Sequence, residues 1–370
     1  RSTLFPYTTL FRSSTDARCT RFSEQISGDP FIALVERGAL QQVGFYEDEP
    51  YDSYFSGNVV QICPVGALTS AAYRFQARPF DLKSTTTSCD HCAGGCEIRA
   101  DHRHHQVKRH QAGDDPEVNE EWLCDKGRFG FVSGRGEDRL TRPLVRQNGI
   151  LQVASWPEAI DAAVAGLKAA GSAVGVLPGG RLTVENAYAY SRFARTVLGT
   201  NNIDFRSRAA SEEEAEFLAS RVAGRGMDVT YSDLEAAKHV VLVSYEPEDE
   251  TSVVFLRLRK AVRKNGLKVT TLAPFASRGT QKLSATLIPV APGAEAQTLE
   301  AMELEEGTII LVGERAACQP GLLSEISSKA IRSGARLAWM PRRAGDMGAI
   351  AAGCLPGLLP GSVLDRKSVV

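Results

Sequence analysis

Residues 239–272 read HVVLVSYEPEDETSVVFLRLRKAVRKNGLKVTTL, an apolar run followed by a helical pattern and a second apolar run. We expect a strand at His239–Ser244, a helix over Ser252–Lys264 and a strand at Lys268–Leu272. A helix that connects two strands at this spacing joins parallel neighbours in one sheet. The stretch therefore predicts an α/β fold built on a parallel sheet.

The same alternation extends on both sides of this stretch. Upstream, Ser155-Trp156-Pro157-Glu158 is a capping-box pattern, which predicts a helix from there through Leu167. The acidic run Glu212–Glu214 is typical of a helix start, where negative charge favours the helix dipole. The other predicted elements are, in chain order, a strand at Val174–Leu177, a helix over Val184–Leu198, a strand at Thr308–Val312, a helix near Leu322–Arg332 and a strand at Arg336–Met340.

Composition excludes several classes of protein. The chain has 370 residues, so two or three domains are expected. Lys and Arg number 43 against 44 Asp and Glu, a balance that argues against a polybasic nucleic-acid binder. No uninterrupted apolar run reaches the roughly 18 residues of a membrane-spanning helix. The first residues also lack the order of charged, apolar and small residues that marks a signal peptide.

Both ends of the chain resemble sequencing-adapter DNA translated as protein. Residues 1–13 read RSTLFPYTTLFRS and residues 365–370 read DRKSVV, and complementary strands of one oligonucleotide can encode the two segments. We expect neither segment to be native and exclude both from the fold. On this interpretation, residues 14–364 are a fragment of a longer natural protein.

Four of the eight cysteines form the pattern C-x2-C-x3-C-x27-C, at Cys89, Cys92, Cys96 and Cys124. Three close thiolates with a fourth from a distance suit a [4Fe-4S] cluster, because a short loop can wrap three iron corners while another segment closes the last. Zinc is the first alternative, with His91 as a competing ligand, although zinc sites more often use two pairs. Structural or disulfide-bonded cysteines are the second.

A second candidate site combines Cys63, which precedes Pro64, with Cys19. A remote Cys-Pro is the ferredoxin pattern for adding a distant cluster ligand. Two cysteines cannot hold a cubane, so two ordinary buried cysteines remain an alternative for this pair. The histidines between Cys96 and Cys124 are most simply a solvated hairpin, and Cys318 and Cys354 are expected to be structural.

Beyond these patterns, the sequence resembles the molybdopterin oxidoreductase superfamily. The resemblance lies in the cysteine spacing, in RLTRPL at residues 139–144 and in Ser155-Trp156-x-Glu158-Ala159. More closely, the chain resembles the family of the large iron–sulfur subunit, or G subunit, of bacterial NADH-quinone oxidoreductase, which is respiratory complex I. This closer resemblance covers 17–364 and is carried by RCTRFSEQISGDP at 18–30, VQICPVGALT at 60–69, and the segments 181–208 and 244–278.

The resemblance implies two iron–sulfur sites. Cys89, Cys92, Cys96 and Cys124 correspond to an extra [4Fe-4S] cluster of some bacterial members, which lies off the main electron path. Cys19 and Cys63 correspond to the third and fourth ligands of a second [4Fe-4S] cluster, whose first two ligands fall at Ser13 and Asp16. The implied domains are the C-terminal part of a ferredoxin-like iron–sulfur domain at 14–80, a [4Fe-4S] domain of molybdopterin oxidoreductase type at 81–137 and a truncated molybdopterin-oxidoreductase-like α/β domain at 138–364.

The family's activity follows from the resemblance as well. It implies an electron-transfer subunit of a proton-translocating NADH:quinone oxidoreductase, which passes electrons from the NADH-derived flavin towards quinone, with no catalytic residue and no complete active site in this fragment. The implied partners are the other subunits of the peripheral arm, including the flavoprotein, with no nucleic acid. Membrane contact is made only through partner subunits, so a peripheral position on the cytoplasmic face of the bacterial inner membrane is expected.

Molybdopterin itself is not expected. Where the superfamily's molybdenum enzymes supply a soft metal ligand, this chain has Ala209 and Ala210, with Ser211 displaced by a position. Two alternatives stay open at this point. One is a molybdopterin-dependent oxidoreductase such as a formate dehydrogenase, and the other is a zinc-stapled interaction module.

Overall fold

The structure is a computed structural model that describes residues 16–45, 51–226 and 228–365. The adapter-like residues 1–13, and all of 365–370 except Asp365, lie outside the described residues. The chain divides into two compact units. Unit 1 comprises Arg1–Phe131 and Ser211–Ala344, and unit 2 comprises Val132–Ala210 and Gly345–Val370.

A five-stranded sheet forms the centre of unit 1 and confirms the predicted α/β fold class. Its strands are β8 (His239–Val243), β9 (Lys268–Ala273), β10 (Thr286–Pro289), β11 (Ile309–Gly313) and β12 (Arg336–Met340). They run in the order β10-β9-β8-β11-β12, and every neighbouring pair is parallel. All of β11 and most of β8 are buried, as expected for apolar strands covered on both faces.

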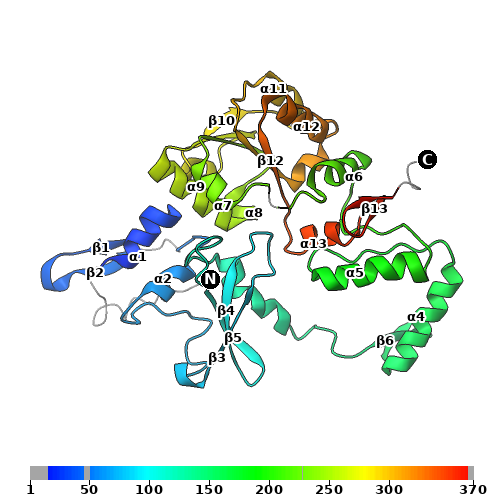
Figure 1. The fold of residues 1–370 in the computed structure, drawn as a ribbon. Coiled ribbons are helices and arrows are strands. Elements are labelled where there is room, and N and C mark those ends of the chain that lie inside the picture. The colour runs from blue at the N-terminus through cyan, green and yellow to red at the C-terminus, as the bar shows by residue number, and fades with distance from the viewer. Residues whose placement is uncertain (1–15, 46–50, 227, 366–370) are drawn as a thin grey trace. The chain divides into compact units, whose positions relative to one another are not determined.

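Helices cover this sheet on both faces (Figure 1). From the centre, the chain crosses from β8 through α9 (Ser252–Asn265) to β9, and from β11 through α12 (Leu322–Ser333) to β12 on the other side. Right-handed crossovers in opposite directions place α9 and α12 on opposite faces. Helix α7 (Tyr231–Ala236) packs beside α9, and α11 (Glu295–Ala301) packs beside α12.

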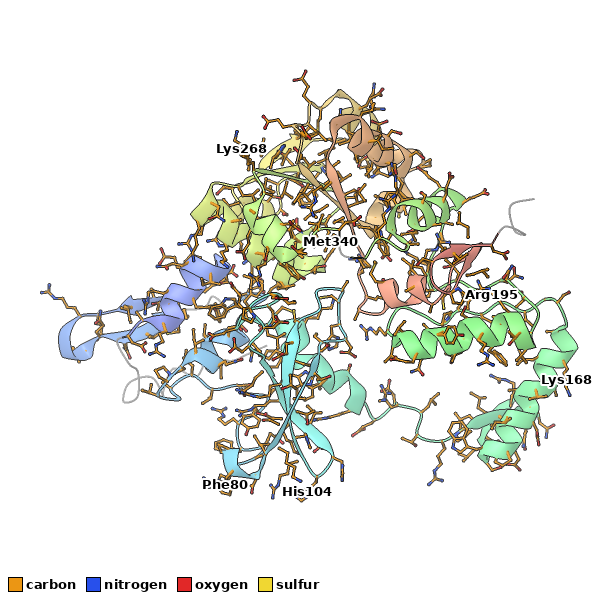
Figure 2. The ribbon with its side chains drawn as sticks, in the orientation of Figure 1. Phe80, His104, Lys168, Arg195, Lys268 and Met340 are labelled. Atoms are coloured by element: carbon orange, nitrogen blue, oxygen red, sulfur yellow. The ribbon has the colours of Figure 1, made fainter. Side chains whose placement is uncertain are left out.

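The cysteine-rich part of unit 1 is an antiparallel sheet with short helices. Strands β3 (Lys83–Ser88), β4 (Glu97–Arg103) and β5 (Gln106–Ala112) pair in that order. His104 and His105 form the β4–β5 turn, with φ of 48° and 60°, as the hairpin interpretation of the histidines predicts. Figure 2 shows His104 at the tip of this hairpin. The other elements here are α1 (Arg18–Arg21), the π-helix Phe22–Ser27, β1 (Ile32–Val35), β2 (Gln42–Phe45), α2 (Gly57–Ile62) and α3 (Asp125–Phe129).

Unit 2 confirms one sequence prediction and corrects two. Helix α4 (Trp156–Ala170) begins with the predicted capping box at Ser155. The expected strand at Val174–Leu177 is wrong, because only Val176 bridges to Ile203 and a strand needs a longer paired partner. The helix predicted over Val184–Leu198 is α-helical only in α5 (Val184–Arg192) and continues as a π-helix over Phe193–Val197.

The remaining helices and strands are short. They are β6 (Leu144–Gln147), β7 (Ile150–Val153), α6 (Glu212–Phe217), the π-helix Leu218–Val222, α8 (Pro247–Glu250), α10 (Arg278–Lys282), α13 (Asp346–Ala351), β13 (Leu358–Leu359) and β14 (Val363–Leu364), with 3-10 turns at Gly38–Leu40, Pro79–Asp81, Gly130–Arg135 and Glu314–Cys318. In the described part of the chain, no helix combines the length and the hydropathy that a bilayer span requires.

One apolar core runs through unit 1. It joins buried residues of the cysteine-rich part, among them Phe22, Phe55 and Cys96, to the sheet residues Val240 and Leu311. The cysteine-rich segments therefore pack directly on the α/β sheet. The domain boundaries implied by the resemblance, at residues 80/81 and 137/138, stay predictions.

Candidate metal centre

The first three cysteines lie on the loop that connects β3 to β4. Cys89 directly follows β3 and Cys96 directly precedes β4, and the amide of Cys89 donates to the carbonyl of Cys96 at 2.9 Å. This hydrogen bond continues the ladder in which Ser88 pairs with Glu97. The antiparallel pair therefore holds the two ends of the loop together, with Cys92 between them. All three side chains are buried.

The fourth cysteine starts a separate helix. Cys124 is the N-cap residue of α3, and its Sγ accepts a hydrogen bond from the amide of Gly127 at 3.4 Å. A Cβ atom at Gly127 would stand only 3.1 Å from the Sγ of Cys89, so the first turn of α3 packs against the loop cysteine. Glycine at position 127 allows this approach.

The four thiols lie within electrostatic reach of one another. Burial raises the pKa of Cys96 well above its usual range, and the thiolates of Cys124, Cys92 and Cys89 raise it further. Burial also raises the pKa of Cys89 to about 12, with added contributions from Cys124 and Cys92. The structure thus brings all four predicted ligands into one another's electrostatic field, as four free thiols.

Backbone N–H groups stabilise the charged form of three of these sulfurs. The amides of His91, Gly94 and Gly127 donate to Cys89, Cys92 and Cys124 respectively, and each bond lowers the pKa of its thiol against the larger effect of burial. Hydrogen bonds to ligand sulfurs are a feature of iron–sulfur sites, where they help to set the reduction potential. The donor set of soft thiolates with backbone N–H partners therefore fits an iron–sulfur cluster.

The two alternatives for this site, a cluster and a zinc ion, differ in how closely they bring the sulfurs together. Among the residues that the structure describes, no three Cys, His, Asp or Glu side chains form a group that could hold a metal ion. A tetrahedral zinc site draws its sulfurs to about 2.3 Å from one centre. A cubane has an iron at each of four corners and spaces its thiolates farther apart.

The second predicted pair also lies together. Cys19 is buried in α1 and Cys63 directly follows α2, and these two helices pack on each other. Burial raises the pKa of Cys19, and the Cys63 thiolate adds to this shift. Of the two positions where the family's first ligands would fall, Ser13 lies outside the described residues, and the Asp16 carboxylate accepts from the amide of Arg18 at 3.1 Å.

The two remaining cysteines, Cys318 and Cys354, lie far from these sites in the sequence. Cys318 is exposed, at the end of a 3-10 turn after β11. Cys354 is buried in unit 2 and its thiol donates to the carbonyl of Ala187 at 3.2 Å. The burial and the contact of Cys354 fit the structural role expected from the sequence, and the same role for Cys318 stays a prediction.

Sequence reasoning missed the residues that support the cysteine loop from behind. The hydroxyl of Tyr231 donates to the carbonyl of Gly94 at 2.6 Å. A Cβ atom at Gly94 would stand 2.8 Å from Cγ1 of Val253 in α9, so this helix packs directly on the loop. Ser252, also in the first turn of α9, donates from its hydroxyl to the carbonyl of Glu248 at 2.8 Å and lowers the pKa of Cys124. More than a hundred residues separate Tyr231 from the loop, and no local pattern announces such a contact.

The carboxyl edge of the parallel sheet carries a cluster of the chain's own polar groups. Doubly wound sheets bind dinucleotides where the strand order reverses, which here is between β8 and β11. A Cβ atom at Gly313 would clash with the carbonyl oxygen of Ser244, so the segment after β8 lies close against the end of β11. The buried carboxylate of Glu250 pairs with Arg315 at 2.7 Å and with Arg342 at 3.7 Å.

The position at which the superfamily's molybdenum enzymes supply a metal ligand does not offer a free ligand in this chain. The Ser211 hydroxyl accepts a hydrogen bond from the Glu214 amide at 3.1 Å and so caps α6, whose start at Glu212 the acidic run predicted. A capping hydroxyl is committed to the helix, and the two alanines before it offer no ligand atom.

Comparison with known families gives three successive matches along the chain. Residues 12–69 match the ferredoxin-like domain of NADH-quinone oxidoreductase subunit 3. Residues 82–133 match the Fe4S4 domain of molybdopterin oxidoreductases, and residues 139–317 match the molybdopterin oxidoreductase family.

Individual relatives point the same way. The G subunit of NADH-quinone oxidoreductase from Mycobacterium bovis is 57% identical over 357 residues, covering 93% of this chain and 44% of the relative. The G subunit from Streptomyces coelicolor is 56% identical over 376 residues, with 93% and 45% covered, and subunit 3 of Thermus thermophilus is 38% identical over 247 residues, with 66% and 30% covered. The chain therefore spans less than half the length of the curated relatives it matches. Because the similarity to the Mycobacterium bovis and Streptomyces coelicolor subunits extends over 93% of the chain, the chain belongs to the family of G subunits of NADH-quinone oxidoreductase.

Proposed function

We propose that this chain is an iron–sulfur electron-transfer part of an NADH:quinone oxidoreductase, which passes electrons from the NADH-derived flavin towards quinone. The observation that supports the proposal is the electrostatic influence of four free cysteines, from a β-loop and a helix N-terminus, on one another, with a backbone N–H group donating to the sulfur of Cys124. The similarity to named subunits of this enzyme supports the direction of electron flow.

The proposed ligands form one complete and one partial site. Cys89, Cys92, Cys96 and Cys124 hold a [4Fe-4S] cluster. Cys19 and Cys63 supply two ligands to a second [4Fe-4S] cluster. The proposed domains remain 14–80 and 81–137 for the two iron–sulfur parts and 138–364 for the α/β part.

The chain's own residues determine how such a site works. A bound [4Fe-4S] cluster supplies one-electron transfer. Cys89 and Cys96 are buried away from water. Electrostatic interactions at their sulfurs are therefore stronger than they would be in solvent. The N–H groups of His91, Gly94 and Gly127 stabilise negative charge on the sulfurs, and this charge increases on reduction.

Partners and location follow from the same proposal. The chain assembles with the other subunits of the peripheral arm, including the flavoprotein subunit, and binds no nucleic acid. It reaches the membrane only through partner subunits, on the cytoplasmic face of the bacterial inner membrane. Molybdopterin has no part in this proposal, because Ala209 and Ala210 stand where the superfamily's molybdenum enzymes supply a soft metal ligand.

Anaerobic reconstitution tests the proposal. The purified chain is incubated with iron and sulfide and analysed for metal, labile sulfide and paramagnetism after reduction. We expect about four irons per chain and a signal on reduction, since the proposed ligands make one complete four-thiolate site. A Cys92→Ser, Cys96→Ser double variant is the matched control and should lose the signal.

The alternative functions predict different analyses. A colourless chain that binds one zinc ion would contradict the proposal and favour the zinc-stapled module. Molybdenum or tungsten with a pterin in the natural protein would favour a molybdopterin enzyme instead.

A further inference from the structure

A buried polar cluster joins the helix before Cys63 to the helix that starts at Cys124. It consists of Asn58 and Gln61 on α2 and Asp125 and Arg128 on α3, and we call these four residues the clamp. Helix α2 ends directly before one proposed ligand, and α3 begins directly after another. The clamp therefore links the two proposed cluster sites, and no ligand belongs to it.

Asp125 supplies the missing cap of α2. Its carboxylate accepts hydrogen bonds from the amides of Ser56 at 3.1 Å and Gly57 at 2.8 Å. These amides lie at the start of α2, where no carbonyl of the same helix can accept their bonds, and no side chain of α2 caps them. A carboxylate at this end also favours the helix dipole. The start of α2 is therefore fixed by the residue that follows Cys124.

Asn58 holds the backbone on the other side of Cys124. The amide of Leu123 donates to Oδ1 of Asn58 at 3.1 Å, and Nδ2 of Asn58 donates to the carbonyl of Leu123 at 2.8 Å. The side chain of Asn58 is only 1% exposed. Together, Asn58 and Asp125 attach α2 to the residues immediately before and after Cys124.

Arg128 closes the clamp with a buried positive charge. Its guanidinium donates to Oδ1 of Asn58 and to Oε1 of Gln61, both at 2.9 Å, while the residue is only 6% exposed. A Cβ atom at Gly57 would clash with Cδ of Arg128, so a glycine at the start of α2 is what allows the arginine to lie there. Burial lowers the pKa of Arg128 to about 10, while the Asp125 carboxylate and then the Cys124 thiolate raise it, so both negative groups lie within electrostatic reach of the guanidinium.

We propose that Arg128 and Asn58 are positioning residues for Cys124, and that the buried charge of Arg128 stabilises the reduced form of the cluster that Cys124 ligates. The proposal rests on the proposed function. A cluster gains negative charge when it is reduced, and a positive charge held in a low-dielectric interior lowers the free energy of that form. Removal of the charge should therefore shift the midpoint potential to a more negative value.

The test compares three variants of the reconstituted chain by redox titration of the paramagnetic signal. Arg128→Met removes the charge and the hydrogen bonds. We expect the equilibrium constant for reduction of the cluster to fall about tenfold, which lowers the midpoint potential by about 59 mV for one electron. Arg128→Lys keeps the charge, and we expect a change of less than about threefold. Arg206→Met is the matched control: Arg206 is 5% exposed and paired with Asp204 at 2.7 Å in unit 2, and its loss should leave the potential unchanged.

A second measurement covers variants that assemble no cluster. Hydrogen exchange in the metal-free chain reports directly on the amides of Leu123 and Gly57, which the clamp holds. We expect Asn58→Ala and Arg128→Met to raise exchange at these amides at least tenfold relative to Arg206→Met. An unchanged potential in assembled Arg128→Met, or unchanged exchange in the metal-free variants, overturns the inference. Failure of the wild-type chain to take up iron and sulfide overturns the proposed function instead, and the exchange measurement still tests the clamp.

Discussion

Truncating Phe255 tests whether the cysteine-bearing segments and the α/β sheet fold as one unit. Phe255 lies in α9 and stacks on Phe55, with ring centroids 5.9 Å apart and planes at 16°, and both rings are fully buried. Replacing a buried Phe by Ala costs about 3–5 kcal/mol, a large part of the 5–15 kcal/mol that stabilises a typical domain. We expect Phe255→Ala to lower the free energy of unfolding by about this amount, and Phe255→Leu by roughly 1–2 kcal/mol.

The assay is urea unfolding followed by hydrogen exchange on peptides from β4 and from β8. We expect Phe55→Leu and Phe255→Leu each to lower the urea concentration at the unfolding midpoint by the same amount whether it is measured on the β4 peptide or on the β8 peptide. In the double variant, the loss should be smaller than the sum by about 0.5–1.5 kcal/mol, the range for an aromatic pair. Phe205→Leu removes a ring of equal burial from unit 2 and calibrates the cost of truncation. The shared core would be refuted if the unfolding midpoint fell for β4 and not for β8. It would also be refuted if the loss of stability in the double variant equalled the sum of the two single losses.

Three further outcomes are expected. Tyr231→Phe should lower the free energy of unfolding by about 1–3 kcal/mol in chemical denaturation, because the buried carbonyl of Gly94 loses its donor; an unchanged midpoint contradicts this. Asp233 has a pKa held below its ordinary 3.8 by hydrogen bonds from Arg336 and from Thr230. Its stabilisation is therefore present above pH 4 and lost as pH falls through the lowered pKa, so Asp233→Asn should cost about 0.5–1 kcal/mol at pH 7, and a cost that persists at the lowest pH would count against this reasoning. Stripping iron from the reconstituted chain with a chelator should lower its thermal midpoint, since the cluster binds the folded site in preference to the unfolded chain; equal midpoints would argue against a cluster held by the folded chain.

The sequence predicts the regular parts of the fold because local patterns determine them. The strands at His239–Val243 and Lys268–Ala273 and the helix between them agree with the structure to within one residue at most ends. The expected strand at Val174–Leu177 fails because a strand is completed by its partner, and only Val176 finds one. The π-helical turn after Arg192 has no sequence signal that we could use.

The candidate site also has a part that the sequence predicts and a part that it does not. The spacing of the four cysteines is enough to predict them as cluster ligands, because a short loop must wrap three corners of a cluster. The residues that hold this loop in place come from far away in the chain. Asn58 binds Leu123 across 65 residues, and Tyr231 binds Gly94 across 137. Such contacts depend on the tertiary fold, and single-sequence reasoning has no access to them.

The cysteine loop and the sheet meet where related folds place a ligand. Helix α9 begins beyond the carboxyl end of β8, at the edge where doubly wound sheets bind nucleotides. In this chain, protein fills that edge: Val253 of α9 packs on Gly94, and Arg257 donates to the carbonyl of Val118 at 2.9 Å. Because Gly94 has no side chain, the first turn of α9 can approach the loop that carries the buried Cys92 and Cys96. The α/β part of unit 1 therefore packs on the cysteine loop, and a bulkier residue at position 94 would separate the two.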